Sequence, residues 1–94
     1  MMREDGVRLS LAGPLTLATV AGLAEQGSAL VAAADRVADL AAVTQVDSAA
    51  LAMLLSWTRA ARAAGRQFSI IGAPDALLSL ASLYDVDTIL PFGR

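Results

Sequence analysis

The clearest element of this sequence begins within Gln45-Val46-Asp47-Ser48-Ala49-Ala50-Leu51-Ala52-Met53-Leu54-Leu55, where a polar loop turns into an apolar helix. Asp47 is suited to cap the unpaired N–H groups of the first helical turn, which leaves Ser48 at the first helical position. A phosphate on Ser48 would lie where the helix dipole already favours anions. The junction therefore fits two interpretations, a switchable recognition surface or an ordinary well-capped helix.

This helix is predicted over residues 48–64, with Gly65 as its stop. At helical spacing one side gathers mostly apolar residues, which we expect to pack on the sheet: Leu51, Leu54, Trp57, Thr58 and Ala61. The opposite side holds mostly small residues: Ser48, Ala49, Ala52, Met53, Ser56, Arg59, Ala60 and Ala63. A solvated face normally carries more charge than this, so the second side is a candidate partner surface. The alanine-rich composition, or a covering helix, would explain the same pattern.

The remaining segments alternate between strand and helix patterns. Four strands are predicted, at Val7–Leu11, Val37–Leu40, Phe68–Ile71 and Thr88–Leu90. The first is expected to end before Gly13-Pro14, and the second is expected to be followed by a loop from Ala41 to Val46. Helices are predicted from Leu15 to about Leu30 and from Asp75 to about Tyr84, the latter opened by Pro74. We therefore expect an α/β fold, a small mixed and mainly parallel sheet with helices packed on it.

The helix predicted from Leu15 is the weaker of the two. Thr16 is a possible cap, and an apolar stripe is formed by Leu17, Val20, Leu23 and Ala24. Gly22 and Gly27 lower its helix propensity and suggest a short or irregular helix.

Composition excludes several classes of function. The chain has 94 residues, of which 56% are hydrophobic, with neither cysteine nor histidine. Thiol chemistry, disulfides and the commonest general base and metal ligands are thereby removed, so we predict neither a metal nor a cofactor. The seven basic residues are all arginine and are outnumbered by nine acids, which disfavours nucleic-acid binding and, without lysine, excludes a P-loop.

The same composition sets the expected size and location. We expect one domain over residues 1–94, with a core at about 7–92. No apolar run is long enough for a membrane span, and the start does not read as a signal peptide, so a cytoplasmic location is expected. Asp39 and Asp47 are the candidate carboxylates for an enzyme, but capping explains them better, and we predict no catalytic site.

The order of elements resembles the STAS domain family, named after sulphate transporters and anti-sigma factor antagonists. The most specific part is Val37-Ala38-Asp39-Leu40 followed by Val46-Asp47-Ser48-Ala49-Ala50-Leu51. The resemblance implies that Ser48 occupies the position of the phosphoacceptor in anti-sigma factor antagonists. Ala50 departs from the glycine usual in the family, which puts recognition by a kinase in doubt more than constitutive binding of a partner.

The later segments Leu77–Val86 and Ile89-Leu90-Pro91 are similar to STAS subunits of Mla-type ABC phospholipid transporters. This resemblance implies a non-catalytic cytoplasmic subunit, peripheral to the inner membrane, that binds the transporter ATPase in a complex with a permease and a lipid-binding component. The alternative is an anti-sigma factor antagonist, switched by phosphorylation of Ser48, whose partner is an anti-sigma factor kinase.

For either partner, the expected contact surface is the loop from Thr44 to Ser48 together with the exposed side of the following helix. Its candidate residues are Thr44, Gln45, Asp47, Ser48, Ala49, Ala52, Met53 and Ser56. The late helix with Tyr84 is expected to flank this surface or to hold it in place.

Overall fold

The computed structural model describes residues 2–93. Its elements follow the order β1 (Met2–Asp5), β2 (Arg8–Leu15), α1 (Leu17–Ala33), β3 (Arg36–Val46), α2 (Ser48–Ala63), β4 (Phe68–Ile71) and α3 (Asp75–Leu83). The described residues form a four-stranded sheet with the order β1-β2-β3-β4. β1 is antiparallel to β2, whereas the other two neighbouring pairs are parallel. The predicted mixed, mainly parallel α/β fold is confirmed.

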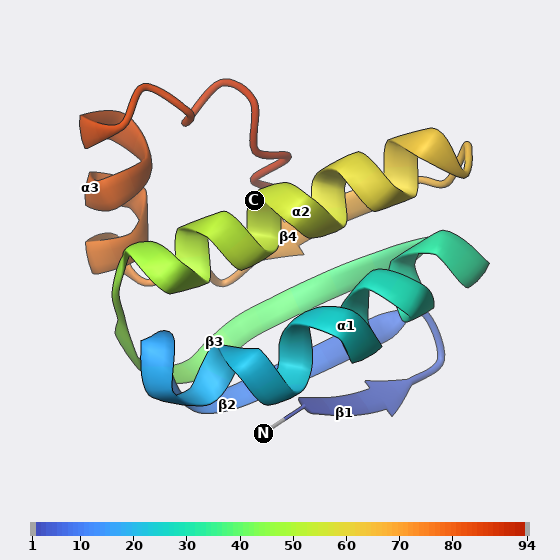
Figure 1. The fold of residues 1–94 in the computed structure, drawn as a ribbon, viewed down its shortest axis with the longest axis horizontal. Coiled ribbons are helices and arrows are strands. Elements are labelled where there is room, and N and C mark those ends of the chain that lie inside the picture. Colours follow the sequence, from blue (N-terminus) through green and yellow to red (C-terminus); the bar gives the residue numbers. More distant parts are fainter. Residues whose placement is uncertain (1, 94) are drawn as a thin grey trace.

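The connections bring two helix starts to the same end of the sheet. β2 and β3 are parallel, and each is followed directly by a helix, α1 after β2 and α2 after β3. The first residues of α1 and α2 therefore lie next to each other, beyond the carboxyl ends of these strands (Figure 1).

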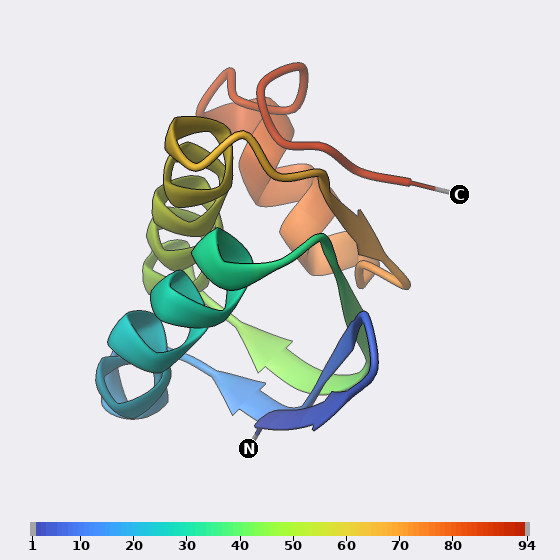
Figure 2. The same cartoon turned by 90° about the vertical axis from the view of Figure 1, so that its right-hand side faces the viewer.

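The core lies between the sheet and the helices. α1 and α2 lie on the same face of the sheet (Figure 2). All five residues predicted to pack inward from α2 are buried, and Trp57 is fully so. The sheet contributes Leu9, Leu11, Leu15, Ala38, Leu40, Val43 and Ile70 to the same core.

α1 is longer and more regular than its glycines suggested. It runs without interruption for 17 residues, with Thr16 as the N-cap residue. Gly27 has a packing role, because a Cβ placed there would lie 2.0 Å from the Trp57 ring. The Trp57 Nε1–H group donates a hydrogen bond of 2.9 Å to the Ala24 carbonyl, so the indole is fixed against α1 on both counts.

β2 does not end at Gly13-Pro14, as the sequence pattern predicted. The strand continues to Leu15, with a shift in register between Gly13 and Pro14. The partners of β1 end at Leu11, so Pro14 lies where β2 is an edge strand on that side. Proline is tolerated at sheet edges and bulges because no ladder hydrogen bond needs its missing N–H.

The extension of β2 also lengthens β3. The segment from Ala41 to Val46, predicted as a loop, pairs with the far part of β2 through contacts such as Val46 with Leu15. The predicted strand Thr88–Leu90 does not form, and nearby Phe92 makes an isolated parallel bridge with Ile70. β1 was not predicted.

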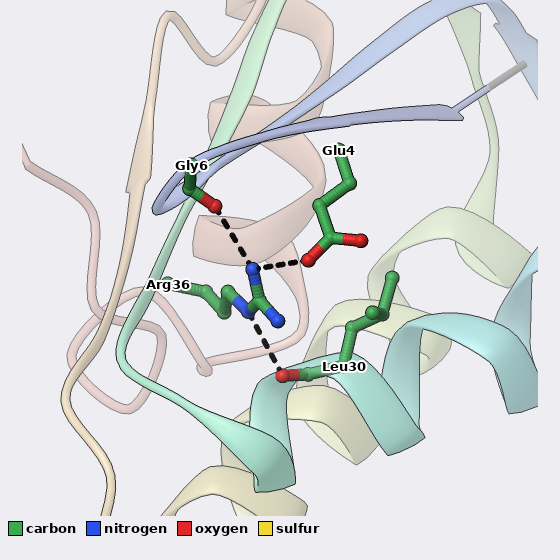
Figure 3. A network of polar contacts seen from close by, with 4 residues as sticks. All are labelled: Glu4, Gly6, Leu30 and Arg36. Carbon is green, nitrogen blue, oxygen red and sulfur yellow. Dashed lines mark hydrogen bonds and ion pairs between the residues drawn. The ribbon is translucent and has the colours of Figure 1, made fainter.

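An arginine with a largely covered side chain, Arg36, joins β1, α1 and β3 at the other end of the sheet (Figure 3). The Arg36 side chain is only 9% exposed, and its Nη1 lies 2.7 Å from Glu4 Oε2. The guanidinium group also donates to the carbonyl oxygens of Gly6, at 2.9 Å, and Leu30, at 3.0 Å. One side chain thereby ties the β1–β2 turn to the last part of α1.

Candidate functional site

Asp47 caps two helices at once. Its Oδ1 accepts a hydrogen bond of 2.8 Å from the Ala49 N–H group in the first turn of α2. Its Oδ2 accepts one of 3.0 Å from the Leu17 N–H group, the first residue of α1. The predicted cap on α2 is confirmed, and the bond to α1 is an addition that local sequence spacing did not reveal. The carboxylate holds the two helix starts together.

Ser48 is the first residue of α2 and is exposed. As the first helical residue it lies at the positive end of the helix dipole, next to the Ala49 N–H group that Asp47 caps. It is therefore accessible to a partner, or to an enzyme that transfers a phosphoryl group.

A groove of about 580 Å³ lies on one side of Ser48, between α1 and α2. Six of the predicted contact residues line it from α2 and its cap, namely Asp47, Ser48, Ala49, Ala52, Met53 and Ser56. α1 contributes Leu17, Val20 and Ala24. Apart from the carboxylate and two hydroxyl groups, these side chains are apolar. We call this hollow the α1 groove.

Met53 does not lie on the exposed face, where the sequence placed it. Its side chain is only 3% exposed, because α1 packs along that edge of α2. Leu17, which belongs to the predicted apolar stripe of α1, is 76% exposed. Both residues line the α1 groove, Met53 as a buried residue in its floor and Leu17 as an exposed residue at its open border.

A second groove of about 410 Å³ lies on the other side of Ser48. Its lining combines one side of α2 with the end of α3 and the turn that follows: Ser48, Leu51, Ala52, Leu55, Tyr84 and Val86. We call it the α3 groove. Ser48 and Ala52 line both grooves and form the ridge between them. Tyr84 thus flanks the predicted surface, as expected.

Thr44 and Gln45 are not part of this arrangement. Both are exposed, but they belong to the end of β3, where Gln45 pairs with Pro14 of β2. Neither residue lines the two grooves. Of the predicted loop, only Asp47 and Ser48 lie beyond the end of β3, as the N-cap and the first residue of α2.

Between residues 2 and 93 there is no group of three or more acidic side chains that could hold a metal ion. Asp39 and Asp47 are separated by most of β3, roughly 25 Å at the rise of an extended strand, which is too far for an acid/base pair. The Asp39 carboxylate accepts a hydrogen bond of 3.0 Å from the Ala41 N–H group. In the same residues no helix has the length and apolar character needed to cross a bilayer.

Comparison with known proteins adds one family and one fold. A sequence model of the family described as the MlaB STAS domain matches residues 2–91. The unphosphorylated anti-sigma factor antagonist SpoIIAA has a similar structure, with a TM-score of 0.76 and 10% identity over 100% of this chain and 87% of that chain. A candidate anti-sigma factor antagonist from Thermotoga maritima gives a TM-score of 0.70 and 15% identity over 98% and 83%. At these identities the two structures show a common fold alone. No curated protein matches the sequence.

Proposed function

This chain belongs to the STAS domain family, in the group described as MlaB, and we propose that it is a non-catalytic interaction subunit of an Mla-type ABC phospholipid transporter. In this role it binds the ATPase subunit on the cytoplasmic side and supports the assembly or activity of the complex. The permease and a lipid-binding component complete that complex, so the chain is peripheral to the inner membrane through its partner.

One observation carries this proposal. Ser48 and Ala52 form an exposed ridge of small side chains between two largely apolar grooves. Such a surface allows close approach of another protein, and it presents apolar area that is favourable to bury. A binding role needs nothing further from Ser48 than its size and its hydroxyl group.

The alternative is an anti-sigma factor antagonist, and the exposure of Ser48 favours it. The two solved structures compared above are described as proteins of that kind. Ala50 bears on this choice, because its side chain is fully buried, and its methyl group therefore faces the core and not an approaching kinase. The departure from glycine at this position is thus a weaker argument against phosphorylation than the sequence alone suggested. About two negative charges on Ser48 would then release the partner by repulsion and desolvation.

The test is affinity purification of the tagged protein from its own cells, with mass spectrometry of its partners and of Ser48. Recovery of an ABC ATPase and permease with unmodified Ser48 supports the transporter subunit. Recovery of a kinase-like ATPase together with phosphorylated Ser48 supports the antagonist and overturns the leading proposal.

Two substitutions then locate the surface. Ser48→Glu should weaken binding of the ATPase by about 2–5 kcal/mol, because it places a charge in a desolvated contact. Ser48→Ala should cost about 1 kcal/mol or less, because it preserves the shape of the ridge. Unchanged binding by a folded Ser48→Glu variant would remove the junction from the interface.

A further inference from the structure

The end of the molecule that carries the two grooves is apolar and acidic. We propose that the protein docked here seats apolar side chains in both grooves and directs an arginine or lysine at Asp85 and Asp87. This inference rests on the proposed function and specifies the chemistry of the partner surface.

The apolar part follows from exposed large side chains around the ridge. Leu17 at the border of the α1 groove is 76% exposed, and on the opposite side Leu83 and Tyr84 are 76% and 55% exposed. Leu17 lies at the start of α1, whereas Leu83 and Tyr84 end α3, so the three come from separate parts of the chain. Exposed apolar area that continues into neighbouring hollows is characteristic of protein-binding surfaces.

The grooves have the dimensions of a protein contact. Along α2, the lining of the α1 groove extends from Ser48 to Ser56, about 12 Å at the rise of an α-helix. That length accommodates two turns of a partner helix with apolar residues at helical spacing.

The acidic part comes from the turn after α3. Asp85 and Asp87 are exposed and alternate with Tyr84 and Val86, which line the α3 groove. Among residues 2–93 the ion pairs are Arg8 with Asp39 and Arg36 with Glu4, so neither turn carboxylate is neutralised within the described chain.

The basic residues of the described chain lie elsewhere. Six arginines fall between residues 2 and 93, and none of them lines either groove. Those of α2 and the turn after it begin only at Arg59, beyond the ridge: Arg59, Arg62 and Arg66. Charge complementarity therefore calls for a cation on the partner beside Asp85 and Asp87.

A second copy of the chain is the competing occupant. It would have to bring its own arginines from the C-terminal half of α2 against the acidic turn. Such a contact either pairs reciprocally in a twofold dimer or repeats head to tail, and in both cases the self-association is detected by sedimentation.

The test compares binding of the purified ATPase subunit by the wild type, by Asp85→Asn/Asp87→Asn, and by the control Asp5→Asn/Glu25→Gln. Asparagine suits position 85, because Asp85 has a φ of 63° and asparagine tolerates the left-handed region. The control removes the same charge from exposed acids outside both grooves.

We expect the dissociation constant of the turn variant to rise by about twofold to fivefold per carboxylate at low salt, with little change in the control. The difference should vanish at high salt, because exposed charges are screened. Binding of the wild type with no effect of the turn substitutions would overturn this inference and leave the proposed function standing. Absence of wild-type binding would overturn the proposed function and this inference with it. Wild-type self-association in sedimentation, lost in the turn variant, would assign the surface to a second copy and also overturn it.

Discussion

Asp47 and Leu17, thirty residues apart, are joined by a hydrogen bond of 3.0 Å from the first N–H group of α1 to a carboxylate oxygen at the start of α2. The other oxygen of the same carboxylate caps α2 itself through Ala49. One side chain directly beside Ser48 thus links the starts of the two helices.

Removal of this carboxylate should destabilise both helix starts. We expect Asp47→Ala to lower the free energy of unfolding by about 2–3 kcal/mol, because a helix cap and a second charge-assisted hydrogen bond are lost. Asp47→Asn keeps one acceptor oxygen and should cost about half as much. Urea denaturation measures both values. Equal stability of Asp47→Ala and Asp47→Asn would show that only one of the two caps contributes.

The two glycines of α1 should respond in opposite directions to the same substitution. Gly27→Ala places a methyl group into the Trp57 ring and should cost about 1–3 kcal/mol or more. Gly22→Ala is its matched control, because a Cβ there meets nothing within 4 Å and should stabilise the helix by about 0.5–1 kcal/mol. Fluorescence of the single tryptophan reports unfolding in both variants. Similar stabilities would show that α1 can move away from Trp57 at little cost.

Arg36 should contribute more to stability than any exposed ion pair. Arg36→Gln removes a buried guanidinium group with three partners, and we expect a loss of about 2–4 kcal/mol. Arg8→Gln is the control, because the Arg8 side chain is 55% exposed and lies 3.9 Å from Asp39. Its loss should be about 0.5 kcal/mol or less. Chemical denaturation distinguishes these values, and a smaller effect for Arg36 would mean that the β1–β2 turn is held by other contacts.

Leu17 should separate partner binding from stability. Because its side chain is largely exposed, Leu17→Ser should leave the unfolding midpoint within a small margin of the wild type. If the α1 groove receives the partner, the same change should weaken binding of the ATPase by about fivefold or more. Val7→Ser is the control, since Val7 is 60% exposed and lies outside both grooves. Equal binding by the two variants would exclude the border of the α1 groove from the interface.

Local sequence patterns were sufficient to predict the elements whose hydrophobic periodicity and bounding residues lie within one segment. α2 has strong helical periodicity, a cap at Asp47 and a glycine stop, and its predicted inward face is the buried one. β4 and α3 are bounded by Gly72 and Pro74 in the same way, and both were predicted closely.

Strand lengths required knowledge of the neighbours. The dipeptide Gly13-Pro14 normally ends a strand. Here β2 continues to Leu15, because Pro14 lies on an edge of the sheet and next to a shift in register, where its missing N–H group is tolerated. Once β2 extends, the segment after Leu40 gains a pairing partner and becomes strand. Neither fact is contained in the local pattern of the segment concerned.

The sequence predicted where Asp47 and Ser48 lie, but not which residues line the grooves beside them. The spacing located Asp47 and Ser48 correctly at the start of α2. The exposure of Leu17 and the burial of Met53 depend on where α1 crosses α2, which is set by the contact of Gly27 with Trp57. That contact joins residues from two different helices, so the hydrophobic periodicity of either helix alone does not reveal it.

The bridge between Ile70 and Phe92 has a consequence for solubility and handling of the protein. The Ile70 N–H group donates to the Pro91 carbonyl at 2.9 Å, and the Gly93 N–H group donates to the Ile70 carbonyl at 2.6 Å. The last residues thereby occupy hydrogen-bonding groups of β4 that would otherwise invite a strand from another molecule. Trimming the chain before Pro91 would uncover this edge and promote aggregation, so a purification tag should leave residues 91–93 in place.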